Sequence, residues 1–157
     1  MGIEIERKYL VHSLGGFVPP PGEAIDQGYL SDGDPTVRVR LRAGRGYLTI
    51  KHRDSVPVGN APITSQEFEY QIPAEDALSM LAFAAARLTK TRHVLESGIE
   101  LDIFSGRHSG LVLAEYESED GSSPECPDGW VWTEVTADRR FSNSWLARNG
   151  MPPTTPA

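Results

Sequence analysis

The sequence predicts a mainly β (α+β) protein whose antiparallel strands close into a barrel, and three observations support this prediction. Seven segments alternate apolar with polar residues, which is the period of a half-buried strand. Most of these segments carry charges at positions i and i+2 on one face and apolar residues on the other. One segment alone has strong helical spacing. Antiparallel all-β chains of this size tend to close, because closure removes the unpaired edge strands.

The first half of the chain is expected to supply five strands. The N-terminal strand places Glu4, Glu6 and Lys8 on one face. The sequence Gly44-Arg45-Gly46 predicts a tight hairpin between the third and fourth strands. Residues 53–65 hold two prolines, a glycine and an asparagine, so we expect a long loop that could act as a lid. The expected strands span residues 3–11, 24–30, 36–43, 47–52 and 66–72.

The second half begins with the strong helix, which Pro73 opens with Glu75 and Asp76 in its first turn, where the helix dipole favours anions. A second, short helix is expected from the N-cap residue Ser142 through Arg148. The apolar stripe of the first helix is expected to comprise Leu78, Leu81, Ala85 and Leu88. Further strands are expected over residues 88–96, 99–104, 111–118 and 131–136.

Composition restricts the class of protein. A chain of 157 residues suits one domain, here residues 1–150, followed by a flexible proline-containing tail over residues 151–157. A net charge of −7 argues against a nucleic-acid partner, which would need a basic surface. No run of eighteen apolar residues and no leader are present, so we expect no membrane partner. The single cysteine, Cys126, fits a cytoplasmic location. Outward apolar faces with one long helix to cover them favour a homodimer.

The charged strand faces point to a function if they line the barrel interior. On one strand alone, such a face is usually solvated surface. On so many strands, the charges would meet in the lumen, where burying them unpaired is too costly. The lumen must then hold water, metal ions and a polyanion. The carboxylates are Glu4, Glu6, Glu67, Glu69, Glu100, Asp102, Glu115 and Glu117, and the cations are Lys8, Arg38, Arg40, Lys51, Lys90 and Arg92.

In this pattern the chain resembles the CYTH proteins, also called triphosphate tunnel metalloenzymes, and among them the short bacterial inorganic triphosphatases. Glu4-Ile5-Glu6-Arg7-Lys8 matches the Glu-x-Glu-x-Lys signature of the family. The resemblance extends to about Arg148 and implies an eight-stranded antiparallel tunnel with helices outside. The later motifs follow in the family's order as Val37-Arg38-Val39-Arg40, Thr49-Ile50-Lys51, Glu67-Phe68-Glu69-Tyr70, Lys90-Thr91-Arg92, Glu100-Leu101-Asp102 and Glu115-Tyr116-Glu117.

The resemblance also implies roles for individual residues. Tyr29 matches a tyrosine that pairs with the signature lysine, here Lys8, and the pair would activate water. The metal ligands would be Glu4, Glu6, Glu115 and Glu117, with Asp102 as an addition. The triphosphate would be clamped by Lys8, Arg38, Arg40, Lys51, Lys90 and Arg92.

The reaction implied by the resemblance is metal-dependent hydrolysis of inorganic triphosphate to pyrophosphate and phosphate, with Mg²⁺ or Mn²⁺ as cofactor. A tyrosine base predicts an alkaline optimum, because the phenol has a pKa near 10 in water; alternatively the hydroxyl merely orients water or phosphate. Adenylyl cyclase activity, hydrolysis of thiamine or nucleoside triphosphates and non-catalytic polyphosphate binding stay open. Trp130, Trp132 and Trp145 could stack on a base, although packing is their simpler interpretation.

Overall fold

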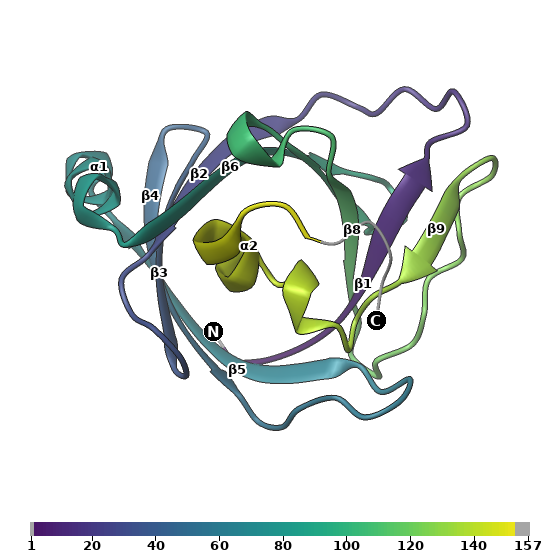
Figure 1. Cartoon of the computed structure of the whole chain (residues 1–157), viewed down its shortest axis with the longest axis horizontal. Coiled ribbons are helices and arrows are strands. Elements are labelled where there is room, and N and C mark those ends of the chain that lie inside the picture. The colour runs from purple at the N-terminus through teal and green to yellow at the C-terminus, as the bar shows by residue number, and fades with distance from the viewer. Residues whose placement is uncertain (1, 153–157) are drawn as a thin grey trace.

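Eight antiparallel strands close into a barrel in the computed structural model, which describes residues 2–152 (Figure 1). Around the barrel the order is β1-β5-β4-β3-β2-β6-β7-β8, and β8 pairs with β1 again. The mainly β, closed antiparallel barrel expected from the sequence is confirmed. The strands are β1 (Gly2–Ser13), β2 (Glu23–Tyr29), β3 (Thr36–Arg42), β4 (Arg45–Arg53), β5 (Ile63–Ile72), β6 (Ala86–Val94), β7 (Glu100–Phe104) and β8 (Val112–Glu117).

The barrel closes where β5 pairs with β1. Glu4 lies opposite Ser65 and Glu6 opposite Ile63 in this antiparallel ladder. The prediction of a loop over residues 53–65 was therefore too long, because β5 begins at Ile63 and the loop spans residues 54–62. The first residues of β5 lack the alternation of the rest of the strand, but pairing with β1 satisfies their backbone groups.

The hairpin between β3 and β4 turns one position earlier than the glycines indicated. Arg42 and Arg45 are paired, so the two turn residues are Ala43 and Gly44, with φ of 49° and 77°. Positive φ at both positions is the type I′ geometry that matches the strand twist. Gly46 instead belongs to β4, where a Cβ would lie 2.8 Å from the Cβ of Ala77. This glycine lets helix α1 approach the barrel wall closely.

Helix α1 (Ala74–Phe83) packs against the outside of the barrel, as expected for the strong helix (Figure 1). Its buried residues are Ala77 and Leu81, which contact Val39 of β3, whereas Leu78 is 55% exposed. The predicted stripe was wrong at its C-terminal end, because the backbone is extended at Ala84 and β6 starts two residues later. Leu88 consequently lies on the inner face of a strand rather than on the helix.

The C-terminal segment covers one end of the barrel. It comprises a 3₁₀ turn, η2 (Arg139–Phe141), and helix α2 (Asn143–Asn149), which lies within the barrel outline in Figure 1. The Ser142 side chain accepts a hydrogen bond from the Trp145 N–H at 3.3 Å, which confirms the predicted N-cap. The C-terminal segment also packs on the barrel through apolar side chains. Phe141, Leu146 and Ala147 of this segment contact the cluster that contains the inward Leu88, Phe104 and Leu113. The lumen is therefore apolar at this end and charged elsewhere.

A ninth strand, β9 (Val131–Glu134), extends the sheet beside the C-terminal half of β1. Trp132 stacks on Tyr9 with ring centroids 4.1 Å apart, and Trp130 meets Trp132 edge-on. These two tryptophans pack outside the lumen, as the simpler interpretation of them predicted. A short 3₁₀ turn, η1 (Gly106–His108), precedes β8. The proposed tail over residues 151–157 lies largely outside the described residues.

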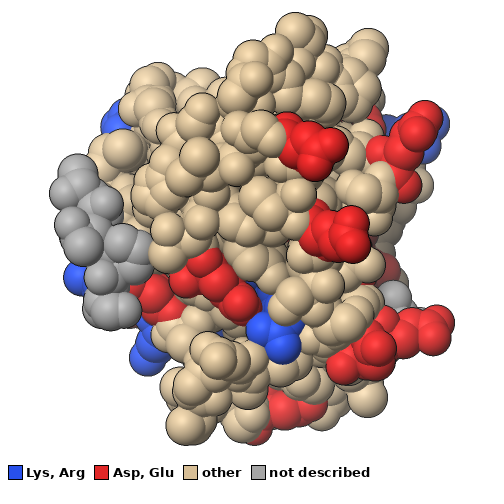
Figure 2. All heavy atoms as spheres, turned by 90° about the vertical axis from the view of Figure 1, so that its right-hand side faces the viewer, with Lys and Arg blue, Asp and Glu red and all other residues tan. Residues whose placement is uncertain are grey.

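The outer surface on the side of β9 carries more acidic than basic side chains (Figure 2). Six of the fifteen lysines and arginines instead belong to the predicted lumen set, and four of them, Lys8, Arg40, Lys90 and Arg92, are buried. Among the described residues, no helix is both long and apolar enough to span a membrane.

Candidate active site

A cavity of about 690 Å³ occupies the charged part of the barrel. In this part of the barrel, alternation along the strands directs charged and polar residues inward and leaves apolar ones outside. Two of the twelve predicted site residues, Lys90 and Asp102, are buried behind the cavity wall. The ten that line the cavity are Glu4, Glu6, Lys8, Tyr29, Arg38, Arg40, Lys51, Arg92, Glu115 and Glu117.

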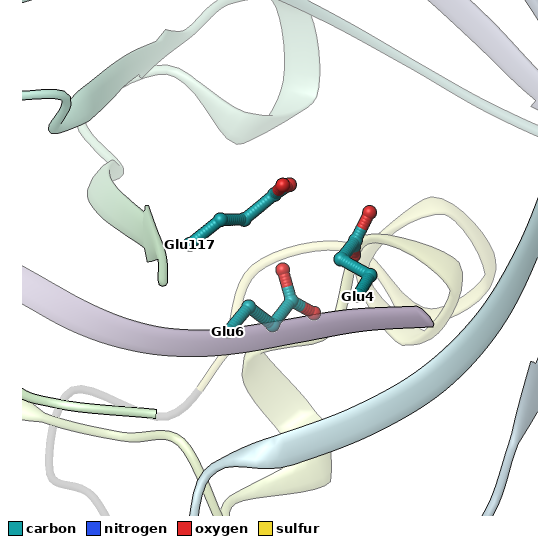
Figure 3. A group of neighbouring side chains, drawn as sticks. All are labelled: Glu4, Glu6 and Glu117. Carbon is teal, nitrogen blue, oxygen red and sulfur yellow. The ribbon is translucent and has the colours of Figure 1, made fainter. Parts of the chain in front are cut away.

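Three carboxylates converge on one side of this cavity. Glu117 extends from β8 toward Glu4 and Glu6 of β1 (Figure 3), and one oxygen of each lies within 4.8 Å of the others. Lys51 of β4 donates a hydrogen bond of 2.6 Å to Glu4 and lies 3.5 Å from Glu6. Burial lowers the pKa of Lys51, but the charges of Glu6 and Glu4 outweigh this effect and raise it overall. Lys51 thus compensates only part of the negative charge.

The donor set of this carboxylate group suits a divalent cation. Burial, followed by the charges of Glu4, Glu100 and Glu6, raises the pKa of Glu117 to about 8. In the metal-free protein the Glu117 carboxyl therefore tends to stay protonated, which reduces its repulsion with the neighbouring carboxylates. A bound cation would relieve the same repulsion. Three convergent carboxylate oxygens are the ligands preferred by Mg²⁺, which is commonly held by a few carboxylates together with water and substrate phosphates. The residues present fit such an ion.

Glu117→Gln is expected to stabilise the metal-free protein at alkaline pH but not at acid pH. The folded-state pKa of Glu117 lies above its unfolded value of 4.5, so its contribution to stability is lost as the pH rises through about 8. Glutamine removes this loss. The measurement is thermal unfolding with a chelator at about pH 5 and about pH 9, on either side of this window. An equal shift at both pH values would contradict the raised pKa.

A second ion network begins in the cavity wall, at Arg92 and Glu115, and extends behind it to the buried Lys90 and Asp102. Asp102 accepts hydrogen bonds from Lys90 at 2.7 Å and from Arg92 at 2.8 Å, and Arg92 also donates to Glu115 at 2.9 Å. Burial raises the pKa of Asp102, but Lys90 and Arg92 outweigh it and lower the pKa overall. The structure thus places Asp102 among cations, apart from the carboxylate group of Glu4, Glu6 and Glu117.

The C-terminal segment contributes to this network. Asn143 of α2 accepts a hydrogen bond from Lys90 at 3.1 Å and donates one to Glu115 at 3.2 Å. The backbone carbonyl of Phe141 accepts one from Lys8 at 3.1 Å, and Lys8 also lies 3.3 Å from Glu115. Sequence reasoning missed Asn143, because nothing near it indicates that the short helix reaches the lumen.

A third set of polar contacts is centred on side chains of β2 and β3 that line the cavity. Arg38 lies 3.4 Å from Glu69 and donates to Thr49 at 3.2 Å, whereas Arg40 donates to the amide oxygen of Gln27. The amide nitrogen of Gln27 donates a hydrogen bond to the Tyr29 hydroxyl oxygen at 2.9 Å. Tyr29 and Lys8 line the same cavity, but each has other hydrogen-bond partners, so their predicted pairing stays a prediction. Gln27 shares a strand face with Tyr29, which was the available signal for this missed residue.

A closed barrel whose lumen combines convergent carboxylates with guanidinium and ammonium groups defines a class of protein that can bind a metal-complexed polyanion. Comparisons with known proteins place the chain more narrowly. Residues 2–131 match the model of the CYTH domain. The chain is therefore a member of the CYTH family, as its ordered motifs predicted.

Three relatives illustrate this similarity. An inorganic triphosphatase of Acetivibrio thermocellus is 35% identical, with 95% of this chain and 96% of the relative covered. An inorganic triphosphatase of Nitrosomonas europaea is 37% identical, with 92% and 96% covered. A crystal structure of an inorganic triphosphatase superimposes with a TM-score of 0.60 at 29% identity, covering 98% of this chain and 97% of the other.

Proposed function

We propose that this protein hydrolyses inorganic triphosphate to pyrophosphate and phosphate in a reaction that depends on Mg²⁺ or Mn²⁺. The observation that supports this most directly is that one cavity is lined both by a convergent carboxylate group and by guanidinium and ammonium groups. The similarity to two inorganic triphosphatases over more than nine tenths of the chain supports the same substrate.

The cations would bind and orient the phosphates. Phosphoryl transfer requires positioning and neutralisation of the transferred oxygens more than covalent chemistry. Arg38 and Arg40 of β3 and Arg92 of β6 line the cavity, and guanidinium groups match phosphate oxygens with paired donors. Glu4, Glu6 and Glu117 would hold the divalent ion, with Glu115 and Asp102 predicted to assist. When bound, that ion supplies charge neutralisation and orientation of the phosphates.

Tyr29 is proposed to act on the attacking water. The residue is 3% exposed and lines the cavity, and its hydroxyl oxygen accepts a hydrogen bond from Gln27, so the hydroxyl proton remains available to the lumen. Lys8 would contact both phosphate and Tyr29 once substrate draws it from the Phe141 carbonyl and Glu115.

The test of this function is phosphate release from inorganic triphosphate, ATP and thiamine triphosphate side by side, with Mg²⁺, with Mn²⁺ and with chelator. We expect fast release from inorganic triphosphate that requires the metal. Faster phosphate release from ATP or thiamine triphosphate would make the protein a nucleoside or thiamine triphosphatase, whereas formation of cyclic AMP and pyrophosphate from ATP would make it an adenylyl cyclase. Binding of triphosphate without release would indicate a polyphosphate-binding module.

Arg38→Ala and Arg40→Ala are expected to weaken triphosphate binding by about 10- to 100-fold, because hydrogen bonds to charged groups contribute about 1.5–3 kcal/mol. Arg42→Ala should cost less than about fivefold, since exposed ion pairs contribute under about 1 kcal/mol. The Arg42 side chain is 26% exposed, lies 3.3 Å from Glu23 and lines a second cavity beyond Arg40. Calorimetric titration measures the three variants, and equal losses would contradict this order.

A cytoplasmic location and a homodimer stay predictions from the sequence. Exposed Ile50, Phe68 and Tyr70 on the outer faces of β4 and β5 support the predicted homodimer. Light scattering of the purified protein measures the oligomeric state directly.

A further inference from the structure

Arg40 differs from the other cations of the lumen in the partner that holds it. None of the ion pairs among residues 2–152 includes Arg40, although this residue is buried, with 8% of its surface exposed. The partner is instead a neutral amide, that of Gln27. The other predicted phosphate ligands have carboxylate partners: Lys8 has Glu115, Arg38 has Glu69, Lys51 has Glu4, Lys90 has Asp102, and Arg92 has Asp102 and Glu115.

The orientation of the Gln27 amide follows from the chemistry of its partners. A guanidinium can only donate, so the amide oxygen must face Arg40, where it accepts from Nε at 3.0 Å and from Nη2 at 2.8 Å. The amide nitrogen is thereby directed to Tyr29, whose oxygen accepts its hydrogen bond at 2.9 Å. Gln27 itself is completely buried, so no water competes for these contacts. One side chain thus fixes both Arg40 and Tyr29.

This arrangement keeps the charge of Arg40 available. A carboxylate at position 27 would hold the guanidinium equally well but would neutralise it, whereas the amide does not. Burial and the charges of Arg38 and Arg92 lower the pKa of Arg40 to about 9, which reflects the missing counter-charge. The amide engages two of the five N–H donors, leaving three for a ligand in the cavity. A phosphate oxygen would supply the missing negative charge.

We propose that Gln27 is a positioning residue for the hydrolysis of triphosphate: it aims Arg40 at a phosphoryl group and Tyr29 at the attacking water, without cancelling the charge of Arg40. This inference rests on the function proposed above. A purely structural role would require only that Gln27 satisfy buried polar groups. The two roles differ in the effect of placing a carboxylate at this position.

The decisive variant is Gln27→Glu, which has the same shape. Glutamate pairs with Arg40, so the substrate-free protein should unfold at the same temperature as the wild type or higher. Binding of inorganic triphosphate, measured by calorimetry, should nevertheless weaken about tenfold or more, because Arg40 loses its uncompensated charge. The value of kcat should also fall, since Tyr29 loses its donor. Gln66→Glu adds the same charge at an exposed position on the outer face of β5, between the inward Ser65 and Glu67, and should bind triphosphate as the wild type does.

A second variant, Gln27→Met, removes all three hydrogen bonds of the Gln27 side chain without adding charge. Its affinity for triphosphate should lie between those of the wild type and Gln27→Glu, while its kcat falls because neither Arg40 nor Tyr29 is held. The inference is overturned if Gln27→Glu binds triphosphate like the wild type, or if Gln27→Met binds it more weakly than Gln27→Glu. A wild-type protein that neither binds nor hydrolyses triphosphate would instead refute the proposed function.

Discussion

Glu6→Gln is expected to lower the metal-dependent hydrolysis of triphosphate about a thousandfold, with the barrel intact. A bound divalent ion contributes several kcal/mol of charge stabilisation, and each 1.36 kcal/mol corresponds to a factor of ten in rate. Glu6 is 8% exposed and belongs to the group whose oxygens lie within 4.8 Å of one another. Removing one of its three charges weakens the site and relieves repulsion, so the metal-free protein should be no less stable.

The measurement is the initial rate of phosphate release as a function of Mg²⁺ concentration for the wild type, Glu4→Gln and Glu6→Gln. Either lumen variant should need far more metal to reach a much lower rate. Glu75→Gln makes the same chemical change in the first turn of α1, outside the barrel, and serves as the control. A wild-type rate at limiting Mg²⁺ in either lumen variant would remove that residue from the metal site.

Strand alternation predicted which face each charged residue occupies. Glu4 and Glu6, like Arg38 and Arg40, lie inside the barrel because residues two apart on a strand share a face. Alternation carries no information about which side chains meet across the lumen, since that depends on the stagger and tilt of the closed barrel. The approach of Glu117 to β1 is predicted only once β8 and β1 are known to be neighbours.

The partners of the site residues were the least predictable part. The pairing of Lys8 with the Phe141 carbonyl joins positions 133 residues apart and involves a backbone group, which no side-chain pattern marks. Leu88 looked like the last position of a helical stripe, because an apolar residue fits either period over a short window. In the structure Leu88 lies in a strand and packs against Leu146 and Phe141 of the C-terminal segment. The local sequence around Leu88 does not encode these distant contacts.

Tyr29→Phe is expected to lower kcat by about a hundred- to ten-thousandfold, the usual contribution of general acid–base catalysis, while KM changes little. The hydroxyl is proposed to act on water chiefly in the transition state, and the loss of such an interaction appears in kcat rather than in KM. The substitution also leaves the amide N–H of Gln27 without its acceptor, so thermal unfolding must show that the variant is folded at the assay temperature.

Steady-state kinetics on inorganic triphosphate, at saturating Mg²⁺ and from mildly acid to strongly alkaline pH, separate a tyrosine base from a merely orienting hydroxyl. If Tyr29 is the base, the alkaline increase of the rate should flatten in Tyr29→Phe. Tyr9→Phe removes another buried hydroxyl, in the aromatic cluster outside the lumen, and should keep the wild-type profile. A lower rate with an unchanged profile would make Tyr29 an orienting group, and an unchanged rate would exclude it from the chemistry.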